Sequence, residues 1–173
     1  NPIPDASITN SNPADCDPVD TDFDIEIYNE VDTALALYKW NLGLGNEALT
    51  QTASGTYTTE TTRDIDGLVD ISVVVTSDKG CDTTLTSTVE VYPNPVASFI
   101  PDPNNYTTAA LPRFTFNNTS KVDDIRGSKI TENNWDFGDF QNPDIDTSTK
   151  EHPSYFYPTD TGSYYVTLNV VTN

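Results

Sequence analysis

Apolar and polar residues alternate with a period of two along several short stretches of this chain. The clearest run follows Gly67, and a second run of the same kind follows Gly162. The apolar positions are Val69, Ile71, Val73 and Val75 in the first run and Tyr164, Val166, Leu168 and Val170 in the second. This period is typical of strands with one buried face. With 12 Pro and 8 Gly as punctuation, the pattern predicts an all-β chain of short strands separated by turns.

Two further segments show the same alternation. Phe23, Ile25 and Ile27 predict an early strand, and the segment 84–92 predicts another through Leu85, Val89 and Val91. Residues 30–38 hold the most helix-friendly stretch, but it is short and contains Val31 and Thr33. We therefore expect a loop that leads into a strand there.

The chain contains a diverged repeat whose copies lie about 91 to 95 residues apart. Four blocks return in order: Pro4-Asp5-Ala6-Ser7-Ile8 as Pro95-Val96-Ala97-Ser98-Phe99, Phe23 and Ile25 as Phe114 and Phe116, Trp40-Asn41-Leu42-Gly43-Leu44-Gly45 as Trp135-Asp136-Phe137-Gly138-Asp139-Phe140, and the run after Gly67 as the run after Gly162. Each copy has the strand spacing of a β-sandwich. The two tryptophans are the expected core centres.

The 173 residues suit two sandwich domains of roughly 80 to 100 residues each. We predict two tandem antiparallel, Ig-like sandwiches, residues 1–93 and 94–173, joined at Pro93-Asn94-Pro95. The second copy shows no counterpart of the strand 84–92, so we expect it to lack its last strand, which leaves an open sheet edge. The start of the sequence resembles the junction, and further modules are expected on both sides.

Charge narrows the possible partners. The chain has 8 basic and 27 acidic residues, a formal net charge of −19. Such a surface repels nucleic acid and anionic lipid, and no apolar segment is long enough to span a membrane. We expect neither nucleic-acid binding nor membrane insertion.

The blocks around Trp135 resemble the PKD (polycystic kidney disease) domain, whose hallmark is W-D-F-G-D-G followed by P-x-Y-x-Y and G-x-Y-x-V-x-L. The matching residues are Trp135-Asp136-Phe137-Gly138-Asp139, His152-Pro153-Ser154-Tyr155-Phe156-Tyr157 and Gly162-Ser163-Tyr164-Tyr165-Val166-Thr167-Leu168. The first module keeps Trp40, Gly43 and Gly45 and departs at Asn41, Leu42 and Leu44. The resemblance implies that Asp136 and Asp139 fix turns through hydrogen bonds to backbone amides.

The resemblance also implies a function. Tandem PKD-like modules with a Gly80-Cys81-Asp82-Thr83 run look like those of secreted adhesins and gliding-motility surface proteins of the Bacteroidetes group. We expect non-catalytic spacer and presentation modules of a bacterial cell-surface adhesin, with neighbouring modules of the same chain as partners. The alternative is a pair of polysaccharide-binding accessory modules in a secreted hydrolase.

Two cysteines, Cys16 and Cys81, most simply form one disulfide in an acidic, strand-rich, secreted chain. On the chain-entropy model such a link contributes about 4 kcal/mol. Two free buried thiols or a pair of metal ligands are the alternatives.

Carboxylates cluster before and within the strand around Phe23, at Asp17, Asp20, Asp22 and Asp24. Calcium takes six to eight oxygen ligands, so calcium is the candidate cofactor, although the spacing does not match an EF-hand loop. A solvated acidic loop is the other interpretation.

Aromatic residues provide the candidate ligand surface. In the family's pattern Tyr155, Tyr157 and Tyr164 point inward, which leaves Phe156 and Tyr165 as outward candidates for stacking on sugar rings. His152 is the single histidine, and its place in the motif indicates a structural rather than a catalytic role. No nucleophile motif surrounds any serine, and we expect no enzyme activity.

Overall fold

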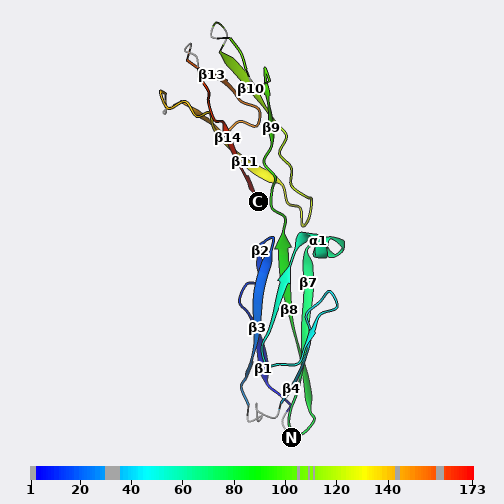
Figure 1. Cartoon of the computed structure of the whole chain (residues 1–173). Helices are drawn as coiled ribbons and strands as arrows, with labels where there is room; N and C mark the ends of the chain where they lie inside the picture. The colour runs from blue at the N-terminus through cyan, green and yellow to red at the C-terminus, as the bar shows by residue number, and fades with distance from the viewer. Residues whose placement is uncertain are drawn as a thin grey trace. The chain divides into compact units, whose positions relative to one another are not determined.

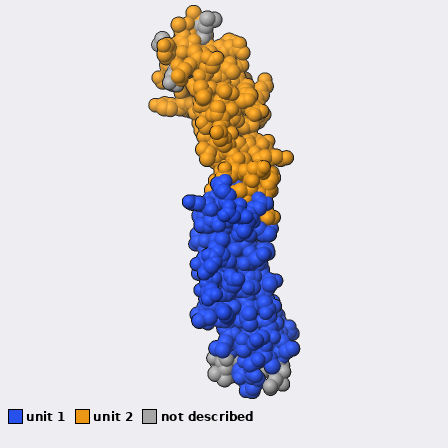
Figure 2. Space-filling model, turned by 90° about the vertical axis from the view of Figure 1, so that its right-hand side faces the viewer, with its two compact units in different colours: residues 1–93 blue, residues 94–173 orange. Residues whose placement is uncertain are grey.

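The structure, a computed structural model, describes residues 3–29, 36–104, 106–108, 110, 112–142, 145–158 and 162–173. It divides into two compact units, Asn1–Pro93 and Asn94–Asn173 (Figure 2). Almost all of the regular structure is β-strand, as predicted. Among the described residues, no helix has both the length and the apolar character needed to cross a membrane.

The first unit is a sandwich of a three-stranded and a five-stranded sheet (Figure 1). The three-stranded sheet has the order β1-β3-β6, with strands at Ala6–Asn10, Val19–Ile27 and Ala53–Tyr57. The five-stranded sheet has the order β2-β8-β7-β4-β5, with strands at Ala14–Cys16, Asp82–Tyr92, Leu68–Thr76, Leu37–Asn41 and Glu47–Ala48.

Strand β2 differs from the expected antiparallel pattern, because it pairs parallel to β8, with Ala14 opposite Glu90 and Cys16 opposite Tyr92. The other strand pairs between described residues of both units are antiparallel. The chain thus leaves the first sheet after β1 and contributes a short edge strand to the second sheet.

A short helix, α1 at Thr59–Thr62, followed by a 3-10 turn at Arg63–Ile65, connects β6 to β7. Thr58 is its N-cap, and the side chains of Thr58 and Thr61 form a reciprocal capping box. This helix has no signal in the sequence, because one turn is too short to produce a helical period.

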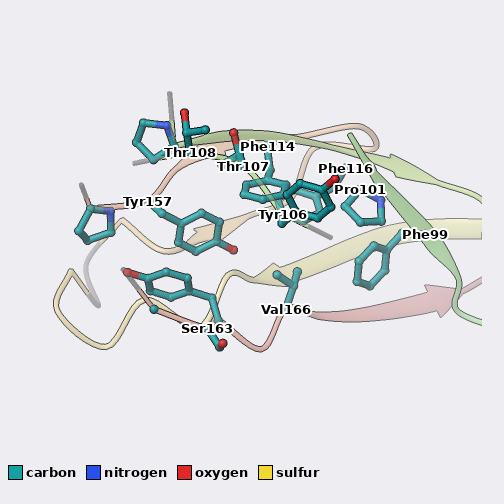
Figure 3. Close-up of a pocket in the computed structure, with 14 residues that line it drawn as sticks. Phe99, Pro101, Tyr106, Thr107, Thr108, Phe114, Phe116, Tyr157, Ser163 and Val166 are labelled. Atoms are coloured by element: carbon teal, nitrogen blue, oxygen red, sulfur yellow. The ribbon is translucent and has the colours of Figure 1, made fainter. Parts of the chain in front are cut away.

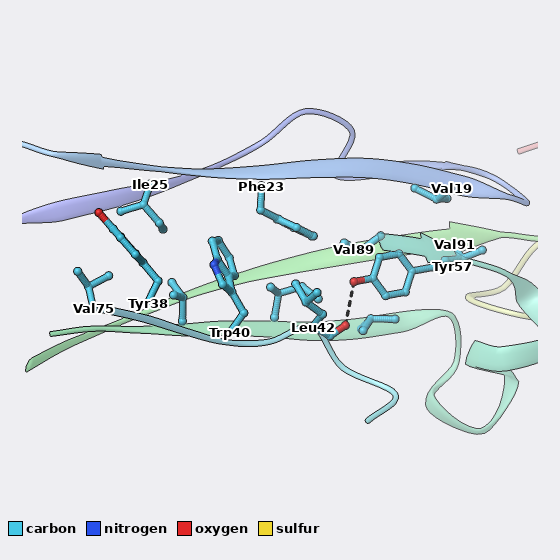
Figure 4. Packing of buried hydrophobic residues seen from close by; sticks show 13 residues of the cluster. Val19, Phe23, Ile25, Tyr38, Trp40, Leu42, Tyr57, Val75, Val89 and Val91 are labelled. Atoms are coloured by element: carbon cyan, nitrogen blue, oxygen red, sulfur yellow. Dashed lines mark hydrogen bonds between the residues drawn. The ribbon is translucent and has the colours of Figure 1, made fainter. Parts of the chain in front are cut away.

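The core of the first unit follows from the alternation in β3, β4, β7 and β8 (Figure 4). Trp40 is fully buried, as predicted, and its ring lies 5.8 Å from that of Phe23. The hydroxyl of Tyr57 donates to the carbonyl oxygen of Leu42 at 2.8 Å. Burial raises the pKa of Tyr57 to about 12, so this hydroxyl keeps its proton at neutral pH.

The second unit is built from two three-stranded sheets. The order of one sheet is β13-β10-β9, with strands at Ser154–Phe156, Arg113–Asn118 and Phe99–Asp102. The order of the other is β12-β11-β14, with strands at Thr147–Ser148, Ile130–Asp136 and Thr167–Thr172. The core between them is more aromatic than that of the first unit, and it centres on Trp135, Phe116, Phe137, Tyr155 and Tyr157.

The internal repeat extends to individual hydrogen bonds. The indole N–H of Trp40 donates to Thr50 O at 2.7 Å, and that of Trp135 donates to Lys150 O at 2.8 Å. The hydroxyl of Tyr157 donates to Phe137 O at 2.9 Å, as that of Tyr57 does to Leu42 O. Both units therefore use the same polar anchors around the core tryptophan.

One detail of the sequence alignment was wrong. Phe23 corresponds to Phe116 rather than to Phe114, because each ring packs against the tryptophan of its unit, at 5.8 Å and 5.7 Å with the same interplanar angle of 41°. Strand pairing agrees: Tyr57 lies opposite Val19, and Tyr157 N donates to Pro112 O. Since these strands alternate with a period of two, the shifted alignment still placed the correct face inward.

Candidate functional site

The loop that follows β11 holds the motif carboxylates, and both of them fix the turn, as expected. Asp136 Oδ1 accepts a hydrogen bond from Gly138 N at 2.8 Å, and Asp139 Oδ1 accepts one from Gln141 N at 3.2 Å. Gly138 has a φ of 67°, and a Cβ there would collide with the carbonyl oxygen of Tyr165. The loop can therefore approach the segment before β14 only with glycine at this position.

Asp139 is completely buried and has a full set of partners. Its Oδ2 accepts hydrogen bonds from the Tyr155 hydroxyl at 2.8 Å and from Asn142 Nδ2 at 2.9 Å. Burial alone raises the pKa of Asp139, but the hydrogen bonds from Asn142, Tyr155 and the backbone outweigh burial, and the pKa falls below its usual range. The pKa of Tyr155 is raised, first by burial and then by its bond to Asp139. Asp139 is therefore a buried structural anion rather than an acid poised for proton transfer.

The first unit keeps one of these two turn-fixing side chains. Asn41 Oδ1 accepts from Gly43 N at 3.0 Å, in the same way as Asp136 in the second unit. Leu44 stands in place of Asp139. Gly55 stands in place of Tyr155, because Gly55 pairs with Thr21 and Tyr155 pairs with Phe114. Thr21 and Phe114 are equivalent, since each lies two residues before the phenylalanine that packs on the core tryptophan. Both partners of the Tyr155–Asp139 bond are thus replaced together.

An open cleft of about 550 Å³ lies between the sheets of the second unit (Figure 3). The wall from β9 and β10 includes Phe99, Phe114 and Phe116, and the segment that leads into β14 contributes Tyr164 and Val166. Its remaining lining residues are Pro101, Tyr106, Thr107, Thr108, Pro112, Tyr157, Pro158, Gly162 and Ser163. The lining is thus aromatic and aliphatic with several hydroxyls, and it holds no carboxylate, amide or cationic side chain among the described residues.

The two aromatic ligand candidates are exposed but point away from each other. Phe156 is 66% exposed and Tyr165 is 85% exposed. Their chain neighbours Tyr157 and Tyr164 stack face to face inside the unit at 4.1 Å. Tyr157 directly follows β13, and Tyr164 lies in the segment that leads into β14, a strand of the other sheet. In extended backbone the neighbouring residue on each segment projects from the opposite face. Phe156 and Tyr165 therefore cannot form one sugar-stacking platform.

Phe156 is also partly covered, because the guanidinium of Arg113 lies 5.5 Å from its ring centre. Three further aromatic side chains that were not predicted as ligand candidates are exposed among the described residues: Phe140 (91%), Tyr106 (82%) and Tyr28 (58%). Phe140 had a signal, because it replaces the last glycine of the family motif. Tyr106 had none, since it lies outside any alternating run.

The expected disulfide between Cys16 and Cys81 is wrong, and both cysteines are free. Cys16 lies opposite Tyr92, at the end of β8, whereas Cys81 immediately precedes Asp82, where β8 begins. The length of β8 separates them by about 33 Å at the usual rise per residue. A disulfide needs Cα atoms within roughly 7 Å.

The candidate calcium ligands do not converge. Asp20, Asp22 and Asp24 are exposed at alternate positions of β3, so neighbouring Cα atoms are roughly 7 Å apart. Asp20 accepts from the Thr56 hydroxyl at 2.6 Å, and Asp17 accepts from the Thr59 hydroxyl at 2.7 Å. In the part of the chain that the structure describes, no group of three or more His, Cys, Asp or Glu side chains could hold a metal ion. Calcium binding stays a prediction, which a calcium titration followed by calorimetric melting tests.

His152 makes a structural contact of the kind expected. Its Nδ1 accepts a hydrogen bond from Asn118 N at 3.1 Å, and this bond ties the loop before β13 to the end of β10. The other ring nitrogen lies 3.7 Å from Glu151 Oε1. Among the residues that the structure describes, His152 contacts Asn118 and Glu151 and no serine hydroxyl, so the geometry gives no support to a serine–histidine pair.

Fold and site together define a protein of two β-sandwich units whose motif side chains maintain turns and core. No family model matches the chain, and no curated protein does. Among solved structures, the three N-terminal domains of the bacteriophage RB49 highly immunogenic outer capsid protein (Hoc) are similar, with 12% identity and a TM-score of 0.45 over 98% of this chain and 57% of that one. This chain thus spans less than two thirds of that structure. A carbohydrate-binding module from the β-sandwich superfamily has 17% identity and a TM-score of 0.41, over 99% of this chain and 84% of that one.

Proposed function

We propose that the two units are PKD-type spacer and presentation modules of a large, secreted bacterial cell-surface adhesin. The observation that carries the proposal is the use of the motif's polar side chains. Asp136, Asp139 and Tyr157 each hydrogen-bond to the turn or the core, and Asn41 and Tyr57 do the same in the first unit. Side chains committed in this way stabilise a module and are not free to act on a substrate.

The surface charge supports the same function. With a net charge of −19, neighbouring copies on a cell surface repel one another, and the modules stay solvated. The exposed carboxylates of β3 belong to this surface.

A second function, polysaccharide-binding accessory modules of a secreted hydrolase, is favoured by one observation. Phe156 and Tyr165 are exposed aromatic side chains, and such rings stack on sugars. Their projection from opposite faces limits each to a contact of one ring.

A pull-down on insoluble chitin and cellulose separates the two functions. Spacer modules are expected to show no saturable retention of the wild-type chain. Saturable retention that is lost in Phe156→Ala or Tyr165→Ala would contradict the spacer proposal and favour the accessory module. Ile100→Ala is a matched control, because Ile100 is also exposed, at 56%, and has no ring to stack on a sugar.

A further inference from the structure

The guanidinium of Arg113 is exposed on the second unit and is not neutralised. Arg113 is the first residue of β10 and lies on the outer face of the sheet β13-β10-β9. Among the described residues, no carboxylate lies within ion-pair distance of its guanidinium. In a chain with a net charge of −19, this cation offers a local site for an anion.

Two side chains of the neighbouring strand β13 hold this guanidinium in place. Strand register places Phe156 opposite Arg113, and Ser154 opposite Thr115. The guanidinium carbon lies 5.5 Å from the centre of the Phe156 ring, within the range of a cation–π interaction. Arg113 Nη2 donates a long hydrogen bond to Ser154 Oγ at 3.4 Å. Since a guanidinium has several N–H donors, most of them stay available to a ligand.

An apolar ring and two hydroxyls surround the cation. Phe156 is 66% exposed even with the guanidinium over its ring. Thr115 follows Arg113 by two positions on β10, and Ser154 precedes Phe156 by two positions on β13. Residues two apart on a strand share a face, so all four side chains lie on the same outer surface. The patch combines an anion-binding group, a stacking surface and hydroxyls.

This combination matches a sugar that carries a carboxylate. A guanidinium binds a carboxylate through paired N–H···O bonds, the C–H face of a pyranose packs on an aromatic ring, and its hydroxyls exchange hydrogen bonds with serine and threonine. A neutral sugar would leave the guanidinium unused, whereas acetate or phosphate would leave the ring unused. Asp102, opposite Thr115 on β9, and the net charge of −19 repel a polyanion, so a glycan with an isolated acidic unit fits best.

We propose that Arg113, Phe156, Ser154 and Thr115 form a binding site for one carboxylated sugar unit of a glycan. Arg113 binds the carboxylate, Phe156 packs against the sugar ring, and the two hydroxyls orient it. The site goes beyond the spacer function, because a spacer needs no ligand. An exposed site of this size binds one sugar with a dissociation constant on the order of a millimolar, and its charge gives it no preference for neutral chitin or cellulose.

The test is a titration of the full chain with sodium glucuronate, observed by NMR at the Arg113 side chain and at the backbone amides of β10 and β13. Glucose is the matched neutral probe, because it has a hydroxymethyl group where glucuronate has the carboxylate. Acetate and inorganic phosphate are anions without a sugar ring. We expect saturable shifts with glucuronate and at least about tenfold weaker binding of the other three probes.

Variants assign the roles of the side chains. Arg113→Gln should weaken glucuronate binding at least about tenfold, and Phe156→Leu should weaken glucuronate binding without changing that of acetate. Lys129→Gln is the matched control, because it removes the same charge from another exposed position of the unit, and it should change the affinity by no more than about twofold. Calorimetric melting without sugar verifies that each variant is folded.

Four results would each overturn the proposal. They are the absence of saturable shifts with glucuronate, equal affinity for glucose, equal affinity for acetate or phosphate, and unchanged affinity in a folded Arg113→Gln variant. None of these results bears on the spacer function, which the pull-down on chitin and cellulose tests separately.

Discussion

The turn between β4 and β5 can be improved by replacing Leu44 with Asn. Asn46 N donates to Gly43 O at 2.9 Å, and the two residues between them, Leu44 and Gly45, have φ values of 51° and 82°. Positive φ at both central positions is the geometry of a type I′ turn, which favours Asn-Gly. The chain has Leu-Gly there, so Leu44 adopts a conformation that its side chain disfavours.

The expected gain follows from the cost of that conformation. An ordinary residue in the left-handed region costs about 1–2 kcal/mol, and asparagine tolerates the region better. Leu44 is 45% exposed, so its removal forfeits part of that gain through lost apolar burial. We expect the free energy of unfolding of the first unit to rise by about 1 kcal/mol, which corresponds to roughly 4–8 °C in its melting temperature.

Differential scanning calorimetry measures this shift, with hydrogen exchange to assign each transition to a unit. Leu49→Asn is the matched control, because Leu49 is 74% exposed and is not among the non-glycine residues with positive φ. The control should change stability by no more than about 0.5 kcal/mol. The turn argument is refuted if Leu44→Asn leaves the first transition unchanged or lowers it, or if both variants gain equally.

Three further predictions concern the motif loop and the cysteines. Because hydrogen bonds lower the pKa of Asp139, its contribution to stability is present above the unfolded-state pKa of about 3.9 and is lost as the pH falls through the lower folded-state value. Asp139→Asn should therefore flatten the acid decline in melting temperature of the second unit below about pH 4, and an unchanged slope would contradict this. Gly138→Ala should destabilise the second unit by more than about 2 kcal/mol in denaturant unfolding. Gly127→Ala is the control, because Gly127 has a similar φ but open space around an added Cβ, and it should cost only about 1–2 kcal/mol. Equal losses of stability in the two variants would refute the clash with Tyr165. Cys16 and Cys81 should both react with a thiol reagent in the native chain, and reductant should leave its melting curve unchanged; a Cys16–Cys81 peptide in a non-reduced digest would overturn the topology.

The parts of the fold that depend on local patterning could be predicted from the sequence. Alternation identified the long strands, because a half-buried strand has to present every second side chain to the core. Trp40 and Trp135 were correctly placed at the core centres, since the repeat preserved both the aromatic residue and the turn after it. The roles of Asp136 and Asp139 were confirmed for the same reason, because an Asx turn is formed by residues close in sequence.

Predictions that depended on which strands become neighbours were less successful. The disulfide failed because sequence spacing does not reveal that Cys16 pairs beside one end of β8 and Cys81 precedes the other. Phe156 and Tyr165 were correctly expected to be exposed, but alternation alone does not say that β13, which contains Phe156, and β14, which Tyr165 precedes, belong to different sheets. The cleft could not be predicted either, since its boundaries come from the register between distant strands.

The joint replacement of Tyr155 and Asp139 by Gly55 and Leu44 changes how divergence between the two units should be counted. A comparison that scores each position separately records two independent departures in the first unit. Physically they are coupled, because the buried Tyr155 hydroxyl without the carboxylate would lose the partner to which it donates, and the carboxylate without Tyr155 would lose one of its hydrogen-bond donors. Any chimera that exchanges the loop after Trp40 with the loop after Trp135 therefore has to exchange the facing position on β6 and β13 in the same step.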